Sequence, residues 1–170
     1  MTREYIDRGF CCDWDGKHKA VNAFGEIYHK KGYLLYVDLQ DKDPFAPIDF
    51  YLTAVSESNV ENQRYAAVEF KERPDTAHTD CPDWIVELRK VKKLQEAAEK
   101  GYTPLYCYLW GDGYMAVWNI NTWDIHKIGN LKVKPHTMGY EGEPKRLFEK
   151  WGVTLSSAVW QGYISDSTLN

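Results

Sequence analysis

Residues 66–73 read AAVEFKER, an apolar run that ends in alternating charges. The run from Tyr65 to Lys71 has the composition of a β-strand. Because side chains two residues apart on a strand point to the same face of the sheet, Glu69 and Lys71 are expected to lie side by side, with Phe70 on the opposite face. The stretch therefore predicts a strand that ends in a carboxylate beside an ammonium group. Taken alone, such a pair is more often a solvated surface ion pair than a functional site.

The strand predicted before this one adds a third charge to the same face. It covers residues 47–55 and carries Asp49 near its start. In an antiparallel hairpin centred near Val60, Asp49 lies directly opposite Lys71 and is a diagonal neighbour of Glu69, at roughly 7–8 Å between backbones. Any even shift of this register keeps all three side chains on one face. Two carboxylates at such a spacing can share one metal ion, and half-buried charges need a partner of that kind.

The opposite face of the two strands is apolar and predicts a core. It is formed by Ile48, Phe50, Leu52, Ala66, Val68 and Phe70. The face that carries the charges is mixed, so a helix is expected to cover it in part.

The rest of the chain alternates between helical and strand-like periodicity. The predicted elements, in chain order, are a helix over 17–31, strands over 33–39, 47–55 and 65–71, a helix from Trp84 to about Gly101, strands over 103–110 and 114–120, and a short helix over 144–151. The last two strands form a hairpin that is apolar on both faces, so its sheet needs cover on both sides. The predicted fold class is therefore α/β, with a mixed sheet flanked by helices. Gly25, inside the first helix, is expected to mark close packing, because glycine there costs roughly 1 kcal/mol relative to alanine.

Composition bounds the class of protein. A chain of 170 residues fits one domain, and a net charge of −4 argues against a general electrostatic grip on nucleic acid or on an anionic membrane. Local clusters of lysine still allow a basic cleft. The four cysteines form no C-x-x-C pair, and neither a targeting peptide nor an apolar run long enough to span a bilayer is visible. A cytoplasmic protein with reduced thiols and no membrane partner is expected.

Three short motifs occur in a suggestive order. Glu26, then Pro47-Ile48-Asp49, then Glu69-Phe70-Lys71 resembles the PD-(D/E)xK nuclease superfamily, whose restriction-endonuclease-like fold has an αβββαβ core. The resemblance covers about residues 15–120 of a single domain over 1–170, with a C-terminal extension over 121–170 for which no role is predicted. One departure is that Ile48 stands between the proline and the aspartate.

The resemblance implies a metal-dependent site. Asp49 and Glu69 would hold Mg²⁺, for which Mn²⁺ substitutes, helped by the Phe70 carbonyl and by Glu26. This is in keeping with the one or two carboxylates that Mg²⁺ usually takes from a protein. The ion would polarise the scissile phosphate and lower the pKa of a bound water. Lys71 would orient that water or neutralise the phosphate, which makes Glu26, Asp49, Glu69 and Lys71 the expected catalytic set. The alternative for Glu26 is a solvated helix glutamate.

The resemblance also implies a DNA partner. Lys90 and Lys93 lie three residues apart on one face of the second helix and, with Lys30, are the expected phosphate contacts, although a solvated face is an equal alternative for each. The function predicted is a Mg²⁺-dependent DNA endonuclease that can form a homodimer. Two alternatives stay open: a non-catalytic module on the same fold that binds nucleic acid or protein, and a nuclease directed at RNA.

Overall fold

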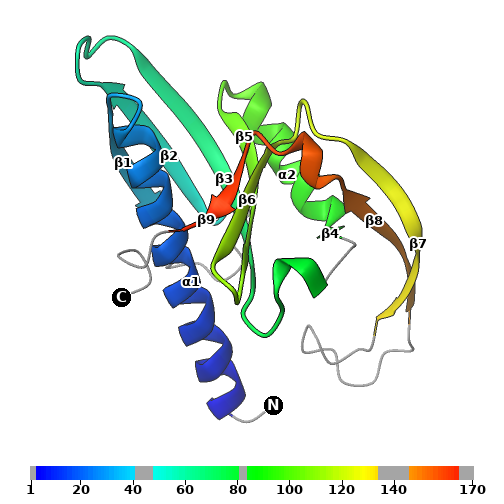
Figure 1. The fold of residues 1–170 in the computed structure, drawn as a ribbon. Coiled ribbons are helices and arrows are strands. Elements are labelled where there is room, and N and C mark those ends of the chain that lie inside the picture. The colour runs from blue at the N-terminus through cyan, green and yellow to red at the C-terminus, as the bar shows by residue number, and fades with distance from the viewer. Residues whose placement is uncertain (1–2, 41–47, 81–83, 134–145, 165–170) are drawn as a thin grey trace.

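The computed structural model describes residues 3–40, 48–80, 84–133 and 146–164, and the side chains within them at 16–40, 48–80, 85–129 and 151–164. The elements, in chain order, are α1 Arg3–His29, β1 Tyr33–Leu39, β2 Phe50–Ser56, β3 Gln63–Arg73, β4 Trp84–Val86, α2 Leu88–Glu99, β5 Thr103–Trp110, β6 Tyr114–Asn119, β7 Ile125–Val133, β8 Arg146–Val153 and β9 Trp160–Tyr163, with 3-10 turns at His78–Asp80 and Leu155–Ser157. Within these ranges, a six-stranded sheet runs in the order β1-β2-β3-β5-β6-β9, in which β3 and β5 are parallel and every other neighbouring pair is antiparallel (Figure 1).

The two helices cover opposite faces of this sheet. On one face α1 packs Ala20, Ala23 and Phe24 against alternate residues of the central strands, among them Phe50 and Val68. On the other face α2 packs Val91, Leu94 and Ala97 against a second layer, which contains Ala67, Tyr106, Tyr108, Trp110 and Trp118. The α/β fold class, with a mixed sheet flanked by helices, is therefore confirmed. The hairpin of β5 and β6 is buried on both faces, as its composition predicts.

The C-terminal part of the chain completes the structure in two ways. β9 pairs with β6 and forms one edge of the main sheet. β7 and β8 pair with β4 in a separate three-stranded sheet, and their ribbon projects from the side of the molecule (Figure 1). Val153 of β8 and Val86 of β4 are buried in the same cluster as α2, so this second sheet extends the core on the α2 face.

One helix prediction is wrong and another is wrong at its start, for the same physical reason. Trp84–Val86 is a strand rather than the first turn of a helix, and Arg146–Val153 is a strand rather than the helix predicted over 144–151, whose first two residues lie outside the described ranges. In both stretches apolar residues recur with a spacing that fits a helix and a strand equally. Pairing between β4 and β8, far apart in the sequence, selects the strand.

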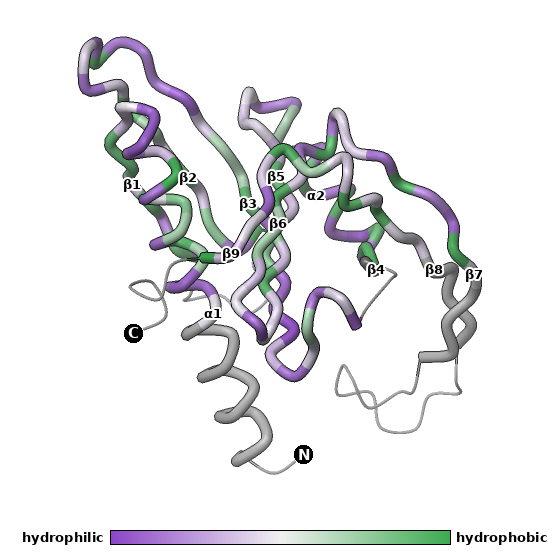
Figure 2. Tube along the Cα trace, viewed as in Figure 1, coloured by the Kyte–Doolittle hydropathy of each residue, from purple (hydrophilic) through white to green (hydrophobic). Residues whose placement is uncertain are grey.

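The turn between β5 and β6 is tied to the chain that follows β3. The backbone N–H of Gly111 donates to the carbonyls of Arg73 (2.9 Å) and Thr76 (3.1 Å). A Cβ at Gly111 would lie 1.8 Å from the Pro74 carbonyl oxygen, so a side chain does not fit there. By contrast, the connection from β2 to β3 is largely hydrophilic and extends into solvent (Figure 2). No helix within the described residues is both long enough and apolar enough to cross a membrane.

Gly111→Ala is expected to lower the Tm by roughly 5 °C or more, since relieving the clash with Pro74 must shift backbone. Gly25→Ala is the matched control. A Cβ at Gly25 would meet no atom within 4 Å, so the close packing expected there is wrong. This variant should gain about 1 kcal/mol from helix propensity. Thermal unfolding followed by circular dichroism measures both, and equal Tm values for the two variants would contradict the account.

Candidate active site

Several chain segments meet at the end of the main sheet where strand β3 ends. β2 is antiparallel to β3, with Phe50 paired to Val68, so β2 begins where β3 is about to end. β3 and β5 are parallel, with Ala66 paired to Thr103, and α2 connects them, so α2 begins near the end of β3. The residues that this topology gathers, here called the charged edge, are Lys17, Asp49, Glu69, Lys71, Glu87 and Lys90.

Asp49 is fixed by three contacts, two with β3 and one with α1. Its backbone N–H donates to the Val68 carbonyl at 3.2 Å, and its Oδ2 accepts a hydrogen bond from the Phe70 backbone N–H at 2.9 Å. Its Oδ1 lies 2.8 Å from the Lys17 ammonium group, which reaches it from α1. The carboxylate is therefore held in one orientation at the start of β2.

The register differs from the predicted one by two residues. In the predicted register Phe50 lies opposite Phe70, whereas in the structure it pairs with Val68, so Asp49 does not lie opposite Lys71. The loop is centred one residue earlier than expected, because Asn59 closes it: its side-chain oxygen accepts from Glu61 N–H, and its carbonyl accepts from Asn62 N–H. Glu69 and Lys71, two residues apart on β3, share a face and pair with Tyr106 and Tyr108 of β5. The face predicted for all three charges is confirmed for these two only, because Asp49 lies before β2 and its carboxylate meets Lys17 of α1.

The start of the strand and the face on which Ile48 lies also differ from the prediction. The chain bends at residues 48–49, and β2 begins only at Phe50. As a result Ile48 is buried in the cluster on the α2 face, whereas Phe50 belongs to the cluster on the α1 face. Pro47 lies outside the described residues. Phe70 packs into the α1-face core, as predicted.

Glu69 is a buried carboxylate with unusual electrostatics. Its residue surface is 4% exposed, and its Oε1 lies 2.7 Å from the Lys90 ammonium group. Its Oε2 is buried and accepts no hydrogen bond from the described residues. Burial raises the pKa of Glu69 to about 8, assisted by the negative charge of Asp49 and opposed by Lys90. A further cation at this carboxylate would therefore be favourable.

Lys71 makes a different contact from the one predicted. Its ammonium group lies 2.7 Å from Glu87, the residue that precedes α2, and Glu87 also contacts Arg89 at 3.2 Å. Burial alone would raise the pKa of Glu87, but Lys71 and Arg89 outweigh it and hold that pKa below its usual range. Lys71 is therefore engaged in an ion pair with α2, and the ammonium group in contact with Glu69 comes from Lys90.

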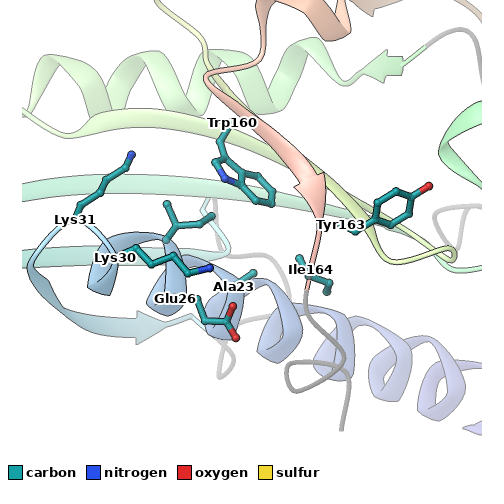
Figure 3. A pocket seen from close by; sticks show the side chains of 8 residues that line it. Ala23, Glu26, Lys30, Lys31, Trp160, Tyr163 and Ile164 are labelled. Carbon is teal, nitrogen blue, oxygen red and sulfur yellow. The ribbon is translucent and has the colours of Figure 1, made fainter.

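Glu26 and Lys30 lie elsewhere. Glu26 is nine residues beyond Lys17 on α1, which corresponds to roughly 13 Å along the helix. Both residues line a cavity of about 270 Å³ between α1 and β9, together with Trp160 and Ile164 (Figure 3). The structure therefore does not bring Glu26 or Lys30 to the charged edge.

The remaining predicted phosphate contacts also separate. Lys90 points to Glu69, whereas Lys93 pairs with Glu96 at 3.0 Å on the exposed face of α2. Glu87 and Lys17 are members of the site that the sequence did not predict. Glu87 falls inside the helix predicted from Trp84, which starts too early, and Lys17 was expected at most to contact phosphate, as Lys30 was.

The donor set is compatible with a hard divalent cation. Within the described residues no group of three His, Cys, Asp or Glu side chains is arranged to hold a metal. Mg²⁺ needs only one or two carboxylates, because it keeps several waters. Asp49 and Glu69 supply two, and the buried Oε2 of Glu69 has a lone pair to offer. Asp49 and Glu69 are therefore the residues that could hold such an ion.

No protein-family model matches the chain, and no curated protein and no solved structure matches it either. Membership of the PD-(D/E)xK superfamily therefore stays a prediction.

Glu69→Gln should change how stability depends on pH. The pKa of Glu69 is 4.5 in its ordinary state and about 8 in the fold, so its contribution is fully present below the lower value and is lost as pH rises through the higher one. In EDTA, between about pH 5 and 8.5, wild type is expected to lose up to about 1.4 kcal/mol of unfolding free energy per pH unit relative to Glu69→Gln.

Denaturant unfolding at a series of pH values measures this difference. Glu96→Gln, which removes an exposed glutamate of α2, is the control and should show no such trend. A difference between wild type and Glu69→Gln that does not vary with pH would contradict the raised pKa.

Proposed function

We propose that this protein is a Mg²⁺-dependent nuclease that hydrolyses phosphodiester bonds of DNA at the charged edge. The observation that carries the proposal is the pair of Asp49, just before β2, and Glu69 on the neighbouring strand β3. Glu69 is buried, with an oxygen that no described residue satisfies. Lysine ammonium groups contact both carboxylates. Carboxylates that could hold a metal, beside cations that could hold phosphate, are the groups that phosphodiester hydrolysis requires.

The order of elements supports the same proposal. Helix α1, strands β1, β2 and β3, helix α2 and strand β5 follow the αβββαβ order of the restriction-endonuclease-like core, with the short β4 inserted before α2. The pairing also suits that core, since β3 lies between antiparallel β2 and parallel β5. We propose this core as the fold and the PD-(D/E)xK superfamily as the family.

The reaction would be a hydrolysis with a simple balance. A water oxygen attacks phosphorus, one phosphorus–oxygen ester bond breaks, and the water proton passes to the departing alkoxide through solvent, which leaves a phosphomonoester and an alcohol. Mg²⁺, when held by Asp49 and Glu69, would neutralise charge on the phosphate and increase the acidity of water. Asp49 would keep its orientation through the Phe70 N–H, and the lysines would contact the phosphate oxygens.

A second function is favoured by one observation. Lys17 and Lys90 already neutralise Asp49 and Glu69, so the same residues can form a structural ion-pair network in a module that binds nucleic acid or protein without cutting it. RNA as substrate, a homodimer and a cytoplasmic location stay predictions. Metal binding separates the two functions, because an ion-pair network has no need of a divalent cation.

A plasmid-nicking assay with Mg²⁺, compared with EDTA, tests the nuclease. Asp49→Asn and Glu69→Gln should each reduce Mg²⁺-dependent nicking by about 100-fold or more, because each removes a charge that would hold the ion. Glu26→Gln and Lys93→Ala are matched controls away from the charged edge and should retain activity within about twofold.

Calorimetry with Mn²⁺ gives an independent result. Wild type should bind Mn²⁺, and both charged-edge variants should bind it at least about tenfold more weakly. Mg²⁺-dependent nicking that survives in both Asp49→Asn and Glu69→Gln would refute the charged edge as the site of cleavage. A wild type that binds no Mn²⁺ would favour the non-catalytic module.

A further inference from the structure

Three lysines reach the charged edge, and each contacts a different carboxylate. Lys17 comes from α1 and pairs with Asp49, Lys71 from β3 pairs with Glu87, and Lys90 from α2 pairs with Glu69. Asp49 and Glu69 are the two central carboxylates, which would hold the metal ion. A lysine that pairs with a different carboxylate is less available to a substrate bound there, so these partners distinguish the roles of the lysines.

Lys71 is anchored away from the two central carboxylates. Its partner Glu87 immediately precedes α2, is held by Arg89 as well, and follows β4, whose Ile85 carbonyl accepts a hydrogen bond from Tyr108 at 2.7 Å. The Lys71–Glu87 pair therefore joins the end of β3 to the start of α2. A lysine in such a pair can position the helix without contacting a substrate.

Lys90 has the opposite placement. It lies in the first turn of α2, where its backbone N–H donates to the Glu87 carbonyl at 2.8 Å. Its ammonium group is 2.7 Å from Glu69, next to the carboxylate whose second oxygen is unsatisfied within the described residues. The Lys90 side chain is 24% exposed, compared with 6% for Glu69, so Lys90 connects the buried carboxylate with solvent, from which a substrate phosphate would arrive.

We infer that Lys90 of α2, and not Lys71 of the E-x-K stretch, is the catalytic lysine that contacts the scissile phosphate, and that Lys71 is a positioning residue which acts on Lys90 through Glu87. The inference rests on the proposed nuclease function. When a divalent cation occupies the carboxylates, the ammonium group of Lys90 no longer has to neutralise Glu69 and can donate to a phosphate oxygen instead. Lys17 is assigned to Asp49, because it approaches from α1, on the other side of the sheet from Lys90.

Three methionine variants test the assignment, because methionine keeps most of the aliphatic stem and removes the charge. Plasmid nicking at saturating Mg²⁺ should fall by about 100-fold in Lys90→Met and by about tenfold in Lys71→Met, where Lys90 is only misplaced. It should not change in Lys93→Met, one turn further along the exposed face of α2.

Mn²⁺ calorimetry without DNA supplies a readout that does not depend on activity. Lys90→Met should bind Mn²⁺ as tightly as wild type or more tightly, since it removes a cation that competes for Glu69. A merely structural Lys90 would instead lower metal affinity and nicking together. Should Lys90→Met not fold, Lys90→Arg tests nicking alone and should lower it, because the planar guanidinium keeps the charge but not the point geometry of the ammonium group.

The outcomes separate the two proposals. Nicking that is lost in Lys71→Met and retained in Lys90→Met overturns the assignment and leaves the nuclease standing. Weakened Mn²⁺ binding in Lys90→Met also overturns it. A wild-type protein that nicks no plasmid with Mg²⁺ or Mn²⁺ refutes the nuclease, and the assignment falls with it.

Discussion

The parallel pairing of β3 with β5 is the constraint on which the rest of the structure depends. Parallel strands cannot be joined by a tight turn, so the chain must return along the sheet, and α2 provides that return. The return places the first turn of α2 beside the end of β3 and lets Lys90 and Glu87 reach Glu69 and Lys71. Because β2 is antiparallel to β3, Asp49 arrives at the same edge. The charged edge is thus a consequence of strand directions.

Burial of Glu69 sets the electrostatic condition of this edge. Desolvation and Asp49 disfavour its ionised form, and a single lysine does not restore the ordinary pKa. A purely structural network would gain stability from an apolar residue at this position. An incompletely satisfied carboxylate at the end of a strand fits the proposed cation-binding role better than a packing role.

Local patterns predicted the sheet well and the site in part. The E-x-K strand, the preceding aspartate and the hairpin of β5 and β6 follow from alternation and turn chemistry, which act over a few residues. The register failed by two residues, because one asparagine, Asn59, decides where the loop closes. β4 and β8 were missed because strand pairing across the sequence overrides an ambiguous apolar spacing.

Which carboxylate each lysine contacts could not be predicted from the sequence, for a related reason. Glu69 and Lys71 are adjacent on one face, and nothing local indicates that α2 supplies a second lysine and a competing glutamate. Which ammonium group meets which carboxylate depends on the start of α2 and on its path across β3, and a shift of one residue in that start would turn Lys90 by about 100° around the helix. The prediction that Glu26 lies close to Asp49 failed for a similar reason, since the distance between them depends on where α1 crosses the sheet.

The balance of charge would link metal to substrate in the proposed nuclease. Among the described ion pairs of this edge, the carboxylates of Asp49, Glu69 and Glu87 face the cationic groups of Lys17, Lys71, Lys90 and Arg89. In the proposed nuclease, a divalent cation that joined them would make the edge strongly positive, and lysines released from carboxylates would then need anionic partners. The phosphodiester of the substrate would provide them. Metal and nucleic acid should therefore each raise the affinity of the protein for the other by the same factor, as linkage requires. Without nucleic acid, the ion has to displace the lysine ammonium groups from the carboxylates while no phosphate is present to bind them.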